Sequence, residues 1–160
     1  MSNFDAKKYN DAKRVGESFF DKNKKIDSLA LGNIRFNSDG FLHLICKNKK
    51  HKRDWKNQVK RFHLLPYVKP VLEKMGYYQE YQEVMEEIMI VDHGSFKRVS
   101  KIVRYWAFVA VIDNKIRIKV ILKKTGNGEI IFWSVIPYWK TNGYKDVKLV
   151  TLYKGNLSMD

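Results

Sequence analysis

Apolar residues recur with helical spacing in the first half of the chain and with strand spacing in the second half. Residues 3–23 roughly keep the period of a helix. Trp55, Val59 and Phe62 are spaced i, i+4 and i+7, which predicts the buried stripe of a second helix. We expect this helix to begin near His51.

Turn-forming and helix-breaking residues predict the boundaries of these elements. NSDG at 37–40 predicts a turn, and FLHLIC at 41–46 then predicts a short buried strand. Pro66 is expected to interrupt the second helix, because proline lacks the backbone N–H that a helix needs. A further helical stripe ends at Gly76 and contains Val68, Val71, Leu72 and Met75.

The second half of the chain predicts antiparallel strands. KIVRYWAFVAVI at 101–112 is apolar almost throughout, which is typical of a central strand that is buried on both faces. KIRIKVILKK at 115–124 alternates strictly and predicts one buried and one polar face. Residues 129–136 predict a third strand and residues 147–153 a fourth.

This order of elements predicts an α+β fold, with N-terminal helices packed on one face of an antiparallel four-stranded β-meander. We expect a single domain over 1–160. It comprises an N-terminal helix and turn (1–39), a core (40–137) and a C-terminal extension (138–160). The acidic segment 79–92 contains no Lys or Arg, and either an edge strand or a helix end that runs into a strand fits it.

Loop lengths predict which side chains share a face of the meander. If residues 113–114 form a two-residue loop, Phe108 faces Lys119, and if 125–128 form the next loop, Lys119 faces Ser134. One face is then a core for the helices, comprising Val103, Tyr105, Ala107, Val109, Val111, Ile116, Ile118, Val120 and Leu122. The opposite, open face carries Arg104, Trp106, Phe108, Arg117, Lys119, Lys123, Phe132 and Ser134. A slip of one residue would invert this assignment.

Charge adds a prediction about partners. The 160 residues carry a formal net charge of +14 and have a pI near 9.8, so nucleic acid or an anionic membrane is the expected partner class. No apolar run approaches the roughly 20 residues that span a bilayer, and the N-terminus lacks the apolar middle of a secretory signal. We therefore expect no membrane partner and a cytoplasmic location, including delivery into the cytoplasm of a target cell.

The predicted open face has the chemistry of a surface for single-stranded RNA. Cations can contact phosphates, while aromatic rings stack on unpaired bases. An ordinary solvated sheet face fits the same pattern. The stretch 43–63 adds eight Lys or Arg against one acid, Asp54, and its candidate RNA contacts are Lys52, Arg53, Lys56, Lys60 and His63. A solvated helix surface is the alternative for these residues.

Three of the four histidines lie in the same stretch. His43 and Cys46 would point to opposite faces of the predicted strand, and His51 and His63 are more than three helical turns apart. No metal site is therefore expected. His43 or His51 could instead move a proton in catalysis. A structural role in the core fits His43 equally, and a turn role fits His93.

Two segments resemble phage-associated nucleases of the barnase–EndoU–colicin E5/D–RelE-like (BECR) group. They are GFLHLICKNKKHKRDWKNQVKRFHLLPYVKPVLEK and IKVILKKTGNGEIIFWSVIP, and the resemblance covers roughly residues 40–137. It implies helices on one face of a four-stranded antiparallel sheet, an RNA site on the open face, and metal-independent endoribonuclease activity, often that of a toxin. His43 and His51 match the family histidines, and Ser134 matches a late hydroxyl residue. Arg117 and Lys119 come from the predicted register.

The sequence thus favours a metal-independent endoribonuclease that cleaves single-stranded RNA by attack of a 2′-hydroxyl, without a cofactor. The predicted catalytic residues are His43, His51, Arg117, Lys119 and Ser134. A non-catalytic RNA- or DNA-binding module of a phage or mobile element is the alternative. A third interpretation is an interaction protein whose basic face meets an acidic inhibitor. The predicted partners are RNA and an acidic antitoxin or immunity protein.

Overall fold

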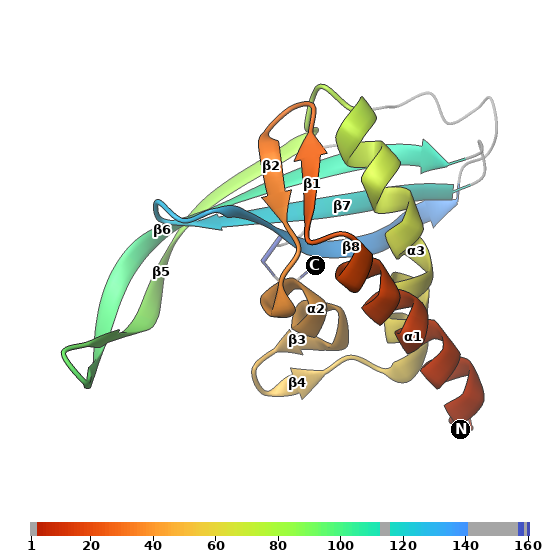
Figure 1. Ribbon diagram of the computed structural model, residues 1–160, viewed down its shortest axis with the longest axis horizontal. Helices are drawn as coiled ribbons and strands as arrows, with labels where there is room; N and C mark the ends of the chain where they lie inside the picture. The colour runs from red at the N-terminus through yellow and green to blue at the C-terminus, as the bar shows by residue number, and fades with distance from the viewer. Residues whose placement is uncertain (1–2, 113–115, 141–156, 159) are drawn as a thin grey trace.

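A computed structural model describes residues 3–112, 116–140, 157, 158 and 160. The first half contains α1 (Ala6–Lys22), β1 (Lys25–Ser28), β2 (Gly32–Arg35), α2 (Ser38–Ile45), β3 (Cys46–Asn48), β4 (His51–Lys52) and α3 (Trp55–Lys74). The second half contains the long strands β5 (Glu80–Asp92), β6 (Ser95–Ile112), β7 (Ile116–Thr125) and β8 (Ile130–Lys140). Figure 1 shows the helices gathered beside one end of the sheet.

The main sheet has six strands in the order β1-β2-β8-β7-β6-β5, and β3 and β4 form a separate ribbon. All pairs in the main sheet are antiparallel except β2 with β8, which run parallel and pair at Arg35 and Ile131. The predicted α+β class is confirmed. The predicted four-stranded meander is wrong, because the β1–β2 hairpin and β5 extend the sheet on both sides.

The core lies between the helices and one face of the sheet. α1 packs on α3, while α2 and α3 contact β8. Phe36 stacks on Phe132 with ring centroids 4.9 Å apart. Gly40 allows α2 to approach β8 closely, because a Cβ at this position would lie 2.2 Å from the Phe132 carbonyl oxygen. This approach fixes the position of the rest of α2 over β8.

The structure corrects the predicted turn and strand at 37–46. Residues Ser38–Ile45 form a helix, whose N-cap Asn37 accepts a hydrogen bond from the Gly40 amide through its side chain. The residues taken as a turn therefore cap a helix. Short apolar runs such as 41–46 fit a helix and a strand equally well, so periodicity alone could not decide. The predicted N-terminal helix, by contrast, is confirmed as α1.

The predicted break at Pro66 is also wrong, because α3 continues through Pro66 and Pro70 and ends at Lys74. Both prolines are exposed and lie one turn apart on the outer side of α3. Pro70 has no N–H for the carbonyl of Pro66, and because Pro66 is exposed this carbonyl can meet water. The predicted stripe persists on the inner side, where Val59 and Phe62 are buried, with Trp55 half-buried. The helix begins at Trp55, four residues after the predicted start.

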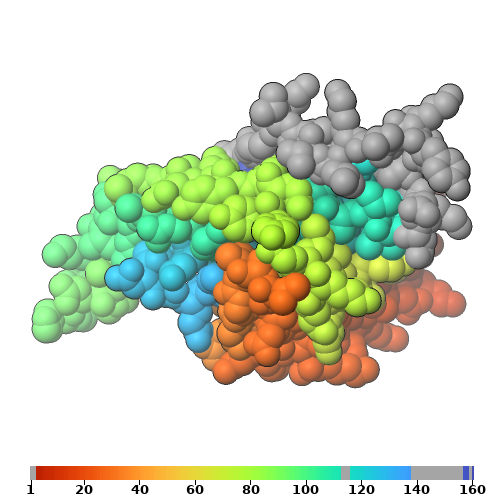
Figure 2. Space-filling model, turned by 90° about the horizontal axis from the view of Figure 1, so that it is seen from above, coloured from red at the N-terminus to blue at the C-terminus, as the bar shows by residue number. Residues whose placement is uncertain are grey.

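Two predictions about the strands are confirmed. β6 lies inside the sheet, between β5 and β7, and the acidic segment forms the edge strand β5. The two strands continue past the rest of the sheet as a two-stranded arm that turns at 92–95. Figure 2 shows this arm extending from the body of the molecule. The predicted loop at 113–114 and strand at 147–153 lie outside the described residues.

The predicted register is wrong by one residue between β6 and β7. It is wrong by two residues between β7 and β8, where Lys119 pairs with Ile136 and not with Ser134. Phe108 pairs with Val120, and Val109 pairs with Lys119. As a result, Trp106 and Phe108 lie in the core beneath the helices, where Phe132 of β8 also lies, and Val103, Tyr105 and Ala107 lie on the opposite face. We call this opposite face the open face. It carries Arg117, Lys119, Lys123 and Ser134, as predicted, but Arg117, Lys119 and Ser134 are buried there.

Among the described residues, no helix combines the length and apolar character that crossing a membrane requires.

A candidate anion-binding site around Ser134

A β-bulge in β8 places two consecutive side chains near the same site. Leu122 of β7 pairs with Phe132, and the residue before it, Ile121, pairs with Ser134, so Trp133 has no pairing partner on β7. Trp133 is the extra residue of the bulge, and it packs against the apolar residues of the open face. Ser134 itself is fully buried. Bulges of this kind often direct side chains toward functional sites.

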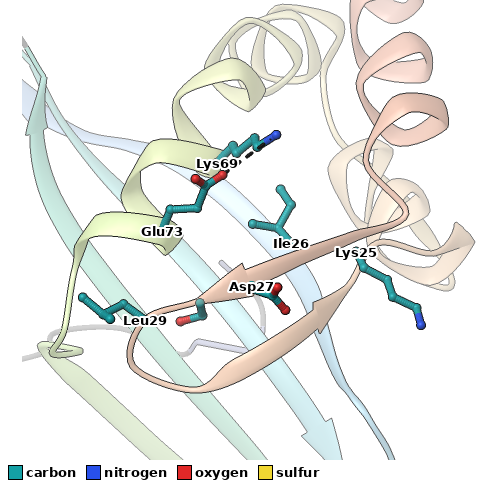
Figure 3. A pocket seen from close by; sticks show the side chains of 7 residues that line it. Lys25, Ile26, Asp27, Leu29, Lys69 and Glu73 are labelled. Atoms are coloured by element: carbon teal, nitrogen blue, oxygen red, sulfur yellow. Dashed lines mark ion pairs between the residues drawn. The ribbon is translucent and has the colours of Figure 1, made fainter.

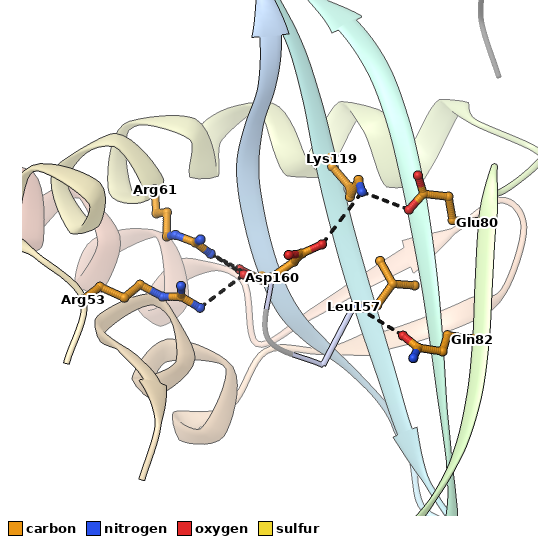
Figure 4. Close-up of polar contacts among 8 residues, drawn as sticks. Arg53, Arg61, Glu80, Gln82, Lys119, Leu157 and Asp160 are labelled. Atoms are coloured by element: carbon orange, nitrogen blue, oxygen red, sulfur yellow. Dashed lines mark hydrogen bonds and ion pairs between the residues drawn. The ribbon is translucent and has the colours of Figure 1, made fainter. Parts of the chain in front are cut away.

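Two arginines from the N-terminal half meet at Asp160 (Figure 4), and one of them, Arg61, also contacts Ser134. Arg61 on α3 donates from Nη1 to Ser134 Oγ at 2.5 Å and to the main-chain oxygen of Asp160 at 2.6 Å. Asn57, one turn earlier, accepts from Arg61 Nε at 2.7 Å and orients the guanidinium. Arg53 donates to the same Asp160 oxygen at 3.2 Å, and Ser134 Oγ lies 3.1 Å from it. Three side chains thus converge on one oxygen atom.

A lysine from β7 approaches the same residue from the sheet. Lys119 Nζ lies 2.9 Å from Glu80 Oε2 and 3.9 Å from Asp160 Oδ2. The side chains of Lys119 and Glu80 are 3% and 2% exposed, so this ion pair is removed from water. Asp160 therefore offers two oxygens to two sets of donors, its main-chain oxygen to the arginines and its carboxylate to Lys119.

His43 joins the site from α2. Its imidazole stacks on Trp133 with ring centroids 4.0 Å apart, and Arg53 Nη2 lies 3.1 Å from His43 Nε2. Because a guanidinium only donates, Nε2 acts as an acceptor and the imidazole is neutral. Burial, and then the positive charges of Arg53, Arg61 and Lys123, lower the pKa of His43 to about 3.

We define the Ser134 cluster as His43, Arg53, Arg61, Glu80, Lys119, Lys123, Trp133 and Ser134. Burial lowers the pKa of Arg61 to about 9, with a further contribution from Arg53. It also lowers the pKa of Arg53 and of Lys123, whose ammonium lies 3.9 Å from the centroid of Trp133. Burial is the main cause of these shifts, because removal from water disfavours the charged form, and an anionic ligand beside the cations would oppose them.

Five predicted site residues meet in this cluster, namely His43, Arg53, Lys119, Lys123 and Ser134. Arg117 follows on the same face of β7 and is 1% exposed. The sequence interpretation missed Arg61, Glu80, Trp133 and Asp160. A signal for Arg61 was present, because Arg61, Leu65, Val68 and Leu72 form one helical stripe in which only the first residue is charged.

The other predicted residues lie elsewhere. His51 is exposed on β4, where its Nδ1 is 2.9 Å from Asn48 Oδ1. Lys52, Lys56, Lys60 and His63 are exposed on β4 and α3. Arg104 lies 3.8 Å from Glu83 in an ion pair between β6 and β5, in the part of the sheet that β7 also joins. Trp106 and Phe108 are core residues, so the predicted stacking of bases on these two rings is wrong. His93 is exposed in the turn of the arm, as its alternative interpretation expected.

A hollow of about 650 Å³ lies elsewhere, between β1 and the C-terminal half of α3 (Figure 3). Lys69 and Glu73, both on α3, line one side of this hollow and form an ion pair at 3.9 Å. Its lining contains no histidine or cysteine, and none of its residues belongs to the Ser134 cluster. We therefore place the candidate chemistry at Ser134. Within the described part of the chain, no group of three or more His, Cys, Asp or Glu could hold a metal ion.

Comparisons of this chain with protein-family models, with curated proteins and with solved structures gave no match.

Proposed function

We propose that the protein is a metal-independent endoribonuclease whose active site is the Ser134 cluster. One observation supports this proposal above the others. His43, Arg61, Lys119 and Ser134 come from four elements, and Arg53 from the loop before α3. Four of these side chains lie within 4 Å of an oxygen of Asp160, and the fifth, His43, contacts Arg53. A proton acceptor beside several cations and a hydroxyl is the set of groups that metal-free RNA cleavage requires.

In the proposed reaction, the 2′-oxygen of RNA attacks the adjacent phosphorus and the bond from phosphorus to the 5′-oxygen breaks. His43 Nε2 accepts the 2′-hydroxyl proton, and the resulting imidazolium returns a proton to the leaving 5′-oxygen. Arg61 and Lys119 stabilise the charge on the non-bridging oxygens, since buried cations act strongly on developing charge. Ser134, held by Arg61, donates to one of these oxygens. The products are a 2′,3′-cyclic phosphate and a 5′-hydroxyl.

The low pKa of His43 fits a base that becomes effective only with substrate bound. In the protein as described, burial and neighbouring cations keep the imidazole neutral. A phosphodiester held by Arg53 and Arg61 would offset those cations and raise the pKa of His43 toward neutrality, where proton transfer is most efficient. Arg53 would then transfer its hydrogen bond from His43 Nε2 to the phosphate.

A non-catalytic nucleic-acid-binding module is the second candidate, and one observation favours it. His43 is 5% exposed, stacked on Trp133 and bonded to Arg53, which is also how a structural histidine behaves. Exposed Lys52, Lys56 and Lys60 would contact phosphates in either case. In both cases the excess positive charge predicts an acidic inhibitor as a protein partner.

Kinship with the BECR group is part of the nuclease proposal. Support comes from a buried hydroxyl, Ser134, on β8 and from helices that cover one face of the sheet. The resemblance implies a strand for the segment that contains His43, whereas the structure has the helix α2.

The deciding experiment compares two histidine variants on labelled single-stranded RNA in EDTA. His43→Gln should lower cleavage about 100-fold or more, because general acid–base catalysis contributes about 10²–10⁴-fold. His63→Gln is the matched control, since His63 is exposed on α3, and it should cleave within about twofold of the unmodified protein, as surface substitutions do. Thermal melting should show both variants folded.

Two results would contradict the nuclease proposal. If the unmodified protein binds RNA but cleaves none, the binding-module interpretation replaces it. If His43→Gln folds and cleaves as fast as His63→Gln, His43 is a structural histidine and another group carries the proton.

A further inference from the structure

Leu157, Ser158 and Asp160 cover the open face at the Ser134 cluster (Figure 4), and we call these three residues the 157–160 segment. Leu157 is fully buried against the open-face residues Val103, Tyr105, Ala107 and Ile121. Its amide donates to Gln82 Oε1 at 3.0 Å, and Trp133 Nε1 donates to the Ser158 carbonyl oxygen at 3.2 Å. The segment is thus anchored by one apolar side chain and two hydrogen bonds.

Asp160 occupies the position that the proposed reaction requires for a phosphate. Its main-chain oxygen accepts from Arg53, Arg61 and Ser134, and its carboxylate lies near Lys119. Two oxygens of one residue thereby meet the groups that would hold the two non-bridging oxygens of a phosphodiester. The carboxylate also supplies negative charge among buried cations, which otherwise lack the stabilisation of water.

We propose that the 157–160 segment is an autoinhibitory plug, with Asp160 competing with a nucleic-acid phosphate for Arg53, Arg61, Lys119 and Ser134. The plug must leave before a phosphate can enter, because both need the same donors. The competition for anions stands on these contacts alone, while its effect on RNA cleavage rests on the proposed function.

The plug makes apparent affinity depend on how often the segment is open. When a binding-competent state is rarely populated, the apparent dissociation constant increases in inverse proportion to its population. A segment that is closed about 90% of the time would weaken binding about tenfold. Variants that loosen the segment should therefore bind more tightly, although they remove contacts.

The test measures binding of a short single-stranded DNA oligonucleotide by fluorescence anisotropy. DNA lacks the 2′-hydroxyl, so binding is measured without cleavage. Leu157→Ala removes the apolar anchor and should tighten binding about tenfold. Asp160→Ala removes the carboxylate near Lys119 but keeps the main-chain oxygen, so it should tighten binding by a smaller factor. Asp11→Ala on the exposed surface of α1 is the control for Asp160→Ala, because both raise the net charge by one. Leu29→Ala, exposed between β1 and β2, is the control for Leu157→Ala.

The outcomes separate the plug from the nuclease. If folded Asp160→Ala binds the oligonucleotide no more tightly than Asp11→Ala, the plug is overturned, whatever the activity on RNA. If both plug variants bind more tightly than their controls and no variant cleaves RNA, the plug stands and the nuclease proposal fails. If Leu157→Ala does not fold, Asp160→Ala alone decides. Faster cleavage by both plug variants than by their controls would support both proposals.

Discussion

The arm and the Ser134 cluster both carry dense charge, but only the cluster carries it out of water. On the arm, acidic β5 lies beside basic β6, and Glu87 pairs with Arg98 at 3.8 Å with both side chains largely exposed. In the cluster, His43, Arg61 and Lys119 are at most 5% exposed. Exposed pairs contribute little to stability, whereas buried cations need a specific anion. An excess of positive charge therefore indicates an anionic ligand in the Ser134 cluster, whereas dense charge on the arm does not.

The largest expected difference between the two regions is in the stability effect of losing one cation. Lys119→Ala would leave the carboxylate of Glu80 buried without its ion pair, which we expect to cost about 3–5 kcal/mol of unfolding free energy. Arg98→Ala on the arm should cost about 0–1 kcal/mol. Urea denaturation of both variants measures the contrast, and equal losses would show that the Lys119 pair is not isolated from water.

A double substitution sharpens this result. Replacing both partners with apolar residues of similar size, as in Lys119→Met with Glu80→Leu, removes the uncompensated charge. We expect the double variant to recover most of the lost stability, because buried ion pairs often exchange for apolar pairs at little cost. A double variant as unstable as Lys119→Ala would mean that the loss comes from packing.

A smaller effect concerns the pH dependence of stability. His43 has a folded-state pKa of about 3 against about 6.5 when unfolded, so the unfolded chain binds more protons between these values. The contribution of His43 to the free energy of unfolding is therefore fully present above pH 6.5 and is lost as the pH falls toward 3. The loss should reach about 1–2 kcal/mol by pH 5, before most carboxylates titrate. His43→Gln should flatten the slope between pH 7 and 5, whereas His63→Gln should leave it unchanged.

The smallest expected effect is in binding through exposed cations. Lys56→Ala on α3 should reduce the slope of log affinity for RNA against log salt by about one unit, because one phosphate contact disappears. Lys97→Ala on the arm should leave the slope unchanged, since acidic β5 lies beside it. A slope reduced equally by both substitutions would remove the distinction between the arm and the helical surface.

Register explains why the sequence predicted one part of the open face correctly. β7 alternates strictly, so its apolar face had to be the core, and Lys119 and Lys123 were correctly assigned to the opposite face. β6 is apolar on both faces and gave no such signal. The assignment of its side chains to the two faces therefore depended on the predicted length of one loop. The prediction paired Ile112 with Lys115, whereas Ile112 pairs with Ile116. One residue of slip moved Trp106 and Phe108 into the core.

The rest of the site depended on contacts that no local pattern encodes. The bulge at Trp133 lets Phe132 enter the core while Ser134 faces outward, which strict alternation cannot predict. Arg61 meets Ser134 across 73 residues of sequence, and Asp160 meets Arg53 across 107. His43 was predicted on a strand, but it lies in the helix α2. Its actual helix is placed by the close approach of Gly40 to β8.

The most direct test of the central claim uses a DNA oligonucleotide that contains a single ribonucleotide, incubated with the protein in EDTA. The Ser134 cluster is proposed to use the 2′-hydroxyl of RNA as the nucleophile, so only the bond on the 3′ side of the ribonucleotide should break. Mass spectrometry should find a 2′,3′-cyclic phosphate on one fragment and a 5′-hydroxyl on the other. Cleavage at deoxyribonucleotides, a requirement for added Mg²⁺, or an intact oligonucleotide under conditions in which it binds would contradict the account.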